Sequence, residues 1–176
     1  MKKVNMAIVG ATGMVGRTFI KVLEERNLPI NDIYFFSSSR SAGSKIIYNG
    51  KEYTVEELTE NSFDRGIDIA LFSAGASVSE KFAPIAASKG CVVVDNSSAW
   101  RMDPKVPLVV PEVNPQDIEW HNGIIANPNC STIQAVIALN PLHKRYRIKR
   151  IVYTTFQAVS GAGMRGYKDL EEGLVG

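Results

Sequence analysis

Residues 127–132 carry the clearest chemical signal in this sequence, because they hold Asn129 and Cys130 between a strand-like run and a helix-like run. The apolar run at 123–126 is typical of a short buried strand, and residues 132–139 have helical composition. Cys130 is therefore predicted to lie at a strand-to-helix turn. The helix dipole and unpaired backbone N–H groups favour a thiolate there. The same N–H groups, helped by the Asn129 amide, are suited to hold an oxyanion formed when sulfur attacks a carbonyl.

This arrangement predicts that Cys130 is the nucleophile of a covalent mechanism. The alternative is a small buried residue that fills the turn, because free cysteine behaves mostly as a small hydrophobic side chain. Cys91 stands inside the apolar run 91–94, where it is most simply a core residue. The residues around Cys130 alone leave both interpretations of that cysteine open.

A glycine-rich turn near the N-terminus is the second signal. The strand-like run 4–9 is followed by Gly10, Gly13 and Gly16, and then by a helix predicted over 17–26. Such glycines allow a tight turn, close approach of the backbone to a pyrophosphate, and packing of the helix on the sheet. The spacing is G-x-x-G-x-x-G rather than G-x-G-x-x-G, so an ordinary glycine-rich turn is the alternative. The predicted inner face of the helix consists of Phe19, Ile20, Val22 and Leu23.

The loop after the second predicted strand, residues 32–36, indicates which dinucleotide would bind. NAD sites place an Asp or Glu here for the ribose 2′-hydroxyl, whereas a 2′-phosphate needs an Arg and small hydroxyl donors. The loop contains Ser38, Ser39 and Arg40 and no acidic residue, which favours NADP. The alternative is a polar, solvated loop.

Other polar and small residues follow later strands. The predicted strand 67–72 ends at Ser73 and Gly75, where small residues let a cofactor lie across the strand tip. Arg101 follows the strand 91–94, at the rim where open α/β sheets bind ligands, so it is a candidate for binding a phosphate or carboxylate. The alternative is a surface arginine.

The order of these elements predicts an α/β fold with a Rossmann-like, doubly wound, mostly parallel sheet over 1–130. A two-strand ribbon is expected over 45–55, turning at Asn49-Gly50, and a helix over 77–89 that Pro84 interrupts. Residues 147–156 alternate like a strand with one covered face. Residues 131–176 are therefore expected to begin a second, α+β domain.

Composition and charge argue against several classes of protein, namely nucleic-acid-binding, metal-binding, secreted and membrane proteins. The net charge of +2 comes from scattered basic residues and offers no case for nucleic acid. The two cysteines stand apart, without metal-ligand spacing, which fits a reduced setting and no metal site. The N-terminal apolar run is too short for a signal sequence, and no run approaches a membrane span. The expectation is a soluble cytoplasmic protein.

Five motifs together resemble the aspartate-semialdehyde dehydrogenase family, essentially from end to end. They are Gly-Ala-Thr-Gly-Met-Val-Gly, Ser-Ser-Arg-Ser-Ala-Gly, Asn-Ser-Ser-Ala-Trp-Arg, Asn-Pro-Asn-Cys-Ser-Thr-Ile-Gln and Gln-Ala-Val-Ser-Gly-Ala-Gly. The cysteine motif is closer to the bacterial branch with Asn-Pro-Asn-Cys than to the branch with Gly-Gly-Asn-Cys. Family members are considerably longer, so the resemblance implies that this chain is an N-terminal portion, in which residues 131–176 begin the catalytic and dimerisation domain.

The resemblance also implies roles for individual residues. Cys130 would be the acylated nucleophile, Gln157 would orient the substrate, and Arg101 with Asn129 would bind its phosphate. The family's general base is a histidine in the later half, and neither His121 nor His143 occurs in a matching motif, so both are expected to be structural or solvated. NADP would lie on Thr12, Gly13, Met14, Val15, Arg40, Ser41, Ser160 and Gly161.

The implied reaction is the reductive dephosphorylation of aspartyl 4-phosphate to aspartate 4-semialdehyde, a step towards lysine, threonine and methionine. Cys130 would displace phosphate, and hydride from NADPH would reduce the thioester. A homodimer or homotetramer is implied at full length. Without the histidine the chain itself is expected to turn over little or nothing. It is also expected to expose the apolar face of Ile148, Ile151, Tyr153 and Phe156.

Two alternatives stand beside this interpretation. One is an N-acetyl-glutamyl-phosphate reductase, which has a similar glycine loop but a different cysteine context, Gly-Cys-Tyr-Pro-Thr. The other is a non-catalytic nucleotide-binding module, which an incomplete second domain favours.

Overall fold

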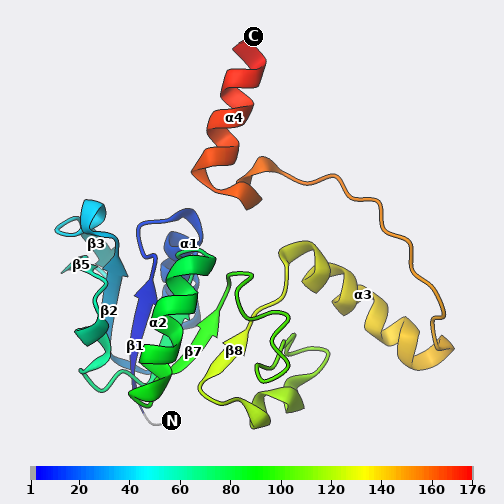
Figure 1. Ribbon diagram of the computed structural model, residues 1–176, viewed down its shortest axis with the longest axis horizontal. Coiled ribbons are helices and arrows are strands. Elements are labelled where there is room, and N and C mark those ends of the chain that lie inside the picture. Colours follow the sequence, from blue (N-terminus) through cyan, green and yellow to red (C-terminus); the bar gives the residue numbers. More distant parts are fainter. Residues whose placement is uncertain (1–2, 176) are drawn as a thin grey trace. The chain divides into compact units, whose positions relative to one another are not determined.

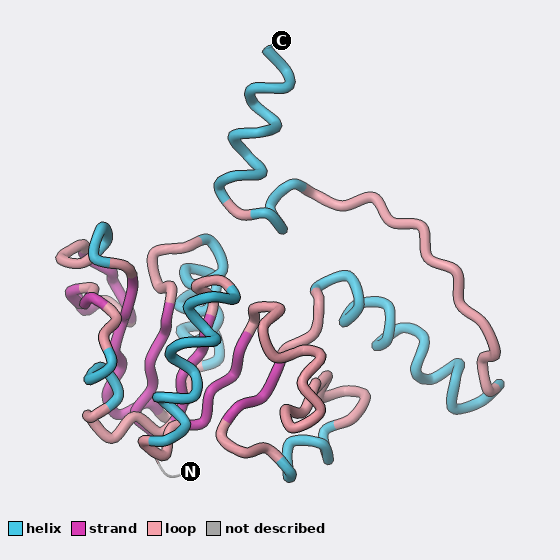
Figure 2. The backbone as a smooth tube through the Cα atoms, in the orientation of Figure 1, coloured by secondary structure: helices cyan, strands magenta, loops and turns pink. Residues whose placement is uncertain are grey.

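A parallel sheet organises the first part of the chain in the computed structural model, which describes residues 3–175 (Figures 1 and 2). The chain divides into two compact units, residues 1–140 and residues 141–176, and each is described by itself. The strand order in the first unit is β5-β2-β1-β6-β7-β8. The strands are β1 (Val4–Val9), β2 (Ile30–Ser37), β5 (Glu56–Glu57), β6 (Ile69–Phe72), β7 (Val92–Asp95) and β8 (Ile124–Ala126).

The sheet has a topological switch point between β1 and β6. All pairings within it are parallel, and Val9 at the end of β1 aligns with Phe36 of β2 and with Phe72 of β6. From β1 the chain builds the sheet outward first through β2 and then, on the other side, through β6. A crevice outside the carboxyl ends of the strands is expected at such a point, and open α/β sheets bind ligands there.

Apolar side chains cover both faces of the sheet, because successive residues of a strand point to opposite sides. On one face Ile8 packs in a cluster with Ile20 of helix α1 (Met14–Arg26). On the other face Val9 packs in a cluster with Ala83 of helix α2 (Ala76–Ser88). The two helices therefore lie on opposite sides of the sheet (Figure 1). The predicted Rossmann-like, doubly wound α/β fold is confirmed.

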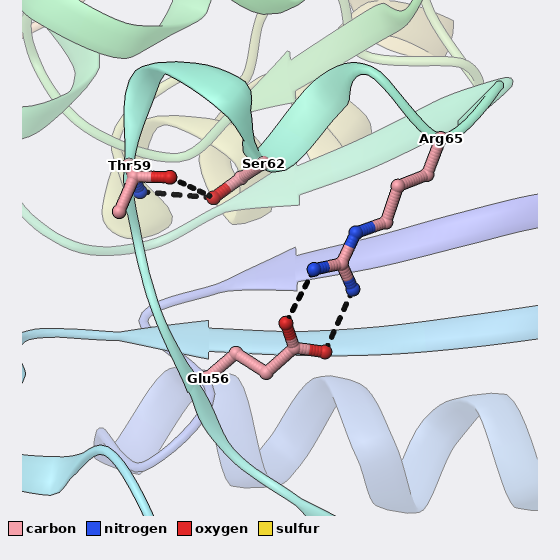
Figure 3. A network of polar contacts seen from close by, with 4 residues as sticks. All are labelled: Glu56, Thr59, Ser62 and Arg65. Atoms are coloured by element: carbon pink, nitrogen blue, oxygen red, sulfur yellow. Dashed lines mark hydrogen bonds and ion pairs between the residues drawn. The ribbon is translucent and has the colours of Figure 1, made fainter.

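The edge next to β2 is held by polar contacts that Figure 3 shows. Both terminal nitrogens of Arg65 donate to the carboxylate of Glu56, at 2.8 and 2.6 Å. The Arg65 guanidinium also lies 5.3 Å from the centre of the Tyr34 ring. Thr59 and Ser62 form a capping box at the 3₁₀ turn η2 (Glu60–Phe63). Through Glu56 and Tyr34, Arg65 therefore joins the short strand β5 to β2.

Several predicted boundaries differ from the structure. The ribbon is confirmed as β3 (Lys45–Tyr48) and β4 (Lys51–Thr54), with positive φ at Asn49 and Gly50. Helix α1 starts at Met14, three residues earlier than expected, and the prediction that Val22 faces inward is wrong because its side chain is 41% exposed. The predicted interruption of α2 is also wrong, since Pro84 lies inside a continuous helix.

The end of the chain is helical rather than β-stranded. Helix α3 (Cys130–Tyr146) extends beyond the apolar run 132–139, and the second unit contains the 3₁₀ turn η4 (Val159–Ala162) and helix α4 (Met164–Val175). The predicted strand over 147–156 is wrong, because no helix or strand occupies those residues. Alternation makes a strand only where a partner takes up its backbone N–H and C=O groups.

The side chains of this segment are largely exposed, as the prediction of an uncovered apolar face requires. Phe156 is 99% exposed, Ile151 and Tyr153 are exposed, and Ile148 is half-buried. Between residues 3 and 175, no helix has both the length and the apolar composition needed to cross a membrane.

Candidate active site and cofactor cleft

A cleft of about 590 Å³ opens at the switch point, as the topology predicts. It brings together most of the residues that were predicted to bind a cofactor. These are Gly10, Thr12, Gly13, Ser38, Ser39, Arg40 and Ser73. Met14 and Val15 open helix α1, Ser41 ends the 3₁₀ turn η1 (Ser39–Ser41), and Gly75 precedes α2, so these four lie next to lining residues without lining the cleft.

The glycine turn between β1 and α1 has the geometry that a bound phosphate requires. Gly10 has a φ of 86°, and a Cβ there would overlap the carbonyl oxygen of Ser73. Gly16 lies so close to the Gly10 carbonyl that a Cβ would clash with it, which lets α1 pack against the turn. Gly13 caps α1 without a side-chain hydrogen bond, so the first N–H groups of the helix face the turn without a side-chain acceptor.

The end of β2 is tied to this turn through side chains. The hydroxyl groups of Ser37 and Thr12 lie 2.9 Å apart and form a hydrogen bond. Ser37 is buried, so the bond fixes where the Ser38–Arg40 loop leaves the sheet. Arg40 lies in η1 and is exposed at the cleft, where its guanidinium can meet an anionic group from solvent.

The sequence did not reveal four further cleft residues: Glu57, Leu58, Val78 and Phe82. The loop after β2 has no acidic residue of its own, as the sequence indicates, but Glu57 brings a carboxylate to the same end of the cleft. It comes from β5, which pairs with β2 and places Glu57 opposite Ser37. Phe82 and Val78 come from α2, whose helical spacing puts both on one face. No local pattern marks a two-residue strand, so the only available signal was the run Val55 to Leu58 between the ribbon and the next turn.

Cys130 is the first residue of α3 and is exposed, so the alternative of a buried filler of the turn is wrong. Asn129 is the residue before the helix, and its side-chain oxygen accepts the N–H groups of Ser131 at 3.0 Å and Thr132 at 3.3 Å. Two amides that the oxyanion hypothesis treats as unpaired are thus used by the cap. The Cys130 N–H and the Asn129 NH₂ group are the donors of this turn that the cap leaves to a substrate.

Arg101 links the loop after β7 to the loop that leads to Cys130. Its Nε donates to the Asn127 carbonyl and its Nη2 to the Asn96 carbonyl, both at 3.0 Å. The two asparagine side chains also bond to each other at 2.8 Å. Arg101 is half-buried and has five N–H donors, so these contacts orient the guanidinium and leave donors for an anion.

Asp95, at the end of β7, is another residue that sequence reasoning missed. It is fully buried, and Ser97 donates its hydroxyl to Oδ2 at 2.6 Å. Asp95 also accepts the Asn127 N–H through its backbone oxygen at 2.8 Å. Asp95 therefore contacts the same two loops as Arg101 from beneath the surface, the loop after β7 through its carboxylate and the loop before Cys130 through its backbone oxygen.

The remaining cysteine and the first histidine have structural surroundings. Cys91 is 1% exposed, and burial raises the pKa of its thiol to about 12. This agrees with the prediction of a core residue. His121 accepts the Gly123 N–H through Nδ1 at 3.0 Å, in line with the expected structural role.

The other predicted residues belong to the second unit. Gln157 is exposed and donates to Thr155 at 3.3 Å, while Ser160 and Gly161 lie in η4. Their assignments to substrate and cofactor stay predictions.

Comparison with known proteins identifies the family of this chain. The model of the semialdehyde dehydrogenase NAD-binding domain matches residues 5–121. An aspartate-semialdehyde dehydrogenase of Aquifex aeolicus is 62% identical over 169 residues, which are 94% of this chain and 49% of that protein.

Two solved structures extend the comparison to the fold. Aspartate-semialdehyde dehydrogenase II of Vibrio cholerae complexed with ASA matches with a TM-score of 0.92 and 47% identity, over 98% of this chain and 52% of that one. The enzyme of Candida albicans with NADP matches with a TM-score of 0.72 and 27% identity, over 82% and 48%. The chain spans about half the length of the curated relatives it matches. It belongs to the semialdehyde dehydrogenase family and, over that half, is similar to aspartate-semialdehyde dehydrogenases.

Proposed function

We propose that this chain supplies the NADP site and the cysteine nucleophile for the reductive dephosphorylation of aspartyl 4-phosphate to aspartate 4-semialdehyde. One observation carries the proposal: Cys130 begins a helix directly after β8, at the carboxyl edge of the sheet that also forms the cofactor cleft. The molecules found with two relatives support it: the Vibrio cholerae enzyme is complexed with ASA, and the Candida albicans enzyme is with NADP.

The residues of the chain suit each step. The Cys130 sulfur attacks the acyl carbonyl, the carbonyl oxygen takes the negative charge beside the Cys130 N–H and the Asn129 NH₂ group, and phosphate leaves toward Arg101. The nicotinamide, when bound, would supply the hydride needed to reduce the thioester to the aldehyde. Cys130 then departs as the thiolate, ready for the next acyl group. Uncapped amides of α1 and the side chains of Ser38, Ser39 and Arg40 hold the dinucleotide, and Arg40 favours NADP.

The test is an assay of a protein of the relatives' full length that contains this chain, with aspartate 4-semialdehyde, NADP and phosphate. NADPH absorbance should rise, and Cys130→Ser should abolish the rise while NADP still binds. Turnover only with the N-acetylated glutamate analogue would contradict the proposed substrate. NADP binding without any turnover would favour a nucleotide-binding module. Sedimentation of the same protein tests the proposed homodimer or homotetramer.

A further inference from the structure

The cofactor cleft holds a carboxylate and a guanidinium at the same end. Glu57 aligns with Ser37 in the parallel pairing of β5 and β2, and the Leu58 N–H donates to the Ser37 carbonyl at 2.8 Å. Strand β5 also packs against η1, which contains Arg40. Glu57 and Arg40 both line the cleft, so two opposite charges meet the ligand where β2 ends.

The direction of the Glu57 side chain follows from its neighbours. Arg65 holds Glu56 by two hydrogen bonds (Figure 3), and successive strand residues point to opposite faces. Glu57 therefore points away from Arg65. It shares its face with the aligned Ser37, whose hydroxyl bonds to Thr12 in the glycine turn. Glu57 is thus directed to the side of the sheet on which the dinucleotide-binding turn lies.

We propose that Glu57 is a specificity-determining residue that limits the preference for NADP over NAD, an inference that rests on the proposed function. A carboxylate at the end of the second strand accepts the 2′-hydroxyl of NAD, and the same carboxylate repels the 2′-phosphate of NADP. Arg40 has the opposite effect. The cofactor preference is the difference between these two neighbouring charges, with the carboxylate supplied by the edge strand instead of the loop.

Glu57→Gln tests the inference, because it removes the charge and keeps the shape. The exposed side chain takes no part in the backbone pairing of β5, so the variant should fold. Calorimetric titration of the variant and the unmutated protein with NADP and NAD gives four dissociation constants. The ratio of the NAD constant to the NADP constant should rise on the order of tenfold in the variant at low salt. NADP should bind more tightly and NAD more weakly, and high salt should shrink the change.

Glu112→Gln is the matched control. Glu112 is exposed and lies outside the lining of the cleft, so this variant has the same net charge as Glu57→Gln and should keep the ratio of the unmutated protein. An unchanged ratio in Glu57→Gln, with both nucleotides bound, overturns the inference and leaves the proposed function standing. An equal shift in Glu112→Gln also overturns it, because net charge alone would then explain the effect. An unmutated protein that binds neither nucleotide overturns the proposed function, and the inference with it.

Discussion

The side-chain oxygen of Asn129 accepts the backbone N–H of Ser131 at 3.0 Å, so the residue before the candidate nucleophile is the N-cap of α3. The Thr132 N–H reaches the same oxygen. Because an amide caps through its oxygen, its NH₂ group stays available to a ligand. Asn129 thus holds the start of the helix through its oxygen, and in the proposed reaction its NH₂ group is the part that would donate to the substrate.

Asn129→Ala should loosen the start of α3. Loss of an N-cap costs about 1 kcal/mol, and the Ser131 and Thr132 amides should exchange with solvent faster. Hydrogen exchange measured by NMR checks this at each amide. Asn129→Ser is the control, because serine caps a helix but lacks the NH₂ group. Equal exchange in Asn129→Ala and the unmutated protein would mean that the cap does not hold the helix.

The two cysteines should differ in reactivity. Cys130 is exposed, whereas Cys91 is buried with a thiol pKa raised to about 12. Limited alkylation at neutral pH should therefore label Cys130 first, with Cys91 labelled only after unfolding in urea. Mass spectrometry of the labelled peptides decides the order. If Cys91 were labelled first, the assignment of Cys130 as the nucleophile would be wrong.

Arg101 should contribute to folding as well as to phosphate binding. Arg101→Ala leaves the carbonyls of Asn96 and Asn127 without their charged donor, which should lower the free energy of unfolding by about 2 kcal/mol. The free energy of unfolding of Arg101→Lys should lie between those of Arg101→Ala and the unmutated protein, because an ammonium keeps the charge but lacks the planar fork that reaches both oxygens. Urea unfolding measures both variants. An unfolding free energy unchanged in Arg101→Ala would limit the residue to ligand binding.

The residues found by sequence reasoning are those whose signal is local. Gly10, Gly13 and the Ser38–Arg40 loop each follow a long apolar strand, and the switch point then brings them to one cleft. Glu57 carries no such signal, because its strand has only two residues. Its pairing with β2 depends on the tertiary fold and not on the local sequence. The sequence therefore predicts the glycine turn and the loop after β2, but it does not predict the part of the cleft that the edge strand β5 forms.

Two wrong predictions, the strand at 147–156 and the later start of α1, come from features that the local sequence does not determine. Alternating side chains describe what a strand would look like if it were paired, but pairing depends on residues far along the chain. The start of α1 depends on Gly13, which lacks a capping side chain and so gives only a weak start signal in the sequence.

The Glu56–Arg65 pair should stabilise the edge of the sheet in a pH-dependent way. Hydrogen bonds from Arg65 lower the pKa of Glu56, so the stabilisation is present above the unfolded pKa of the carboxyl and is lost as pH falls through the folded one. Both side chains are 41% exposed, which limits the contribution to about 1 kcal/mol or less. Arg65→Met should therefore destabilise the protein at neutral pH, measured by urea unfolding.

Urea unfolding of Arg65→Met and of the unmutated protein at acid pH separates the contribution of the ion pair from that of packing. Below the folded pKa of Glu56 the ion pair is absent in both proteins, so the difference caused by Arg65→Met should shrink to the part due to packing on Tyr34. Glu56→Gln is the matched variant, and combining both substitutions gives the coupling free energy. A difference that does not change with pH would assign the whole effect to packing.

Arg40 should carry most of the affinity difference between the two dinucleotides. Its exposed guanidinium lines the cleft beside Ser38 and Ser39, and a charge-assisted bond to the 2′-phosphate is worth about 1–3 kcal/mol. Arg40→Ala should therefore weaken NADP binding by that amount and leave NAD binding nearly unchanged, as measured by calorimetry. With Arg40 absent, Glu57 would remain as the charged group near the ribose, so the variant should approach or pass equal affinity. Equal affinities in the unmutated protein would contradict the predicted preference for NADP, and an unchanged NADP dissociation constant in Arg40→Ala would contradict the assignment of Arg40 to the 2′-phosphate.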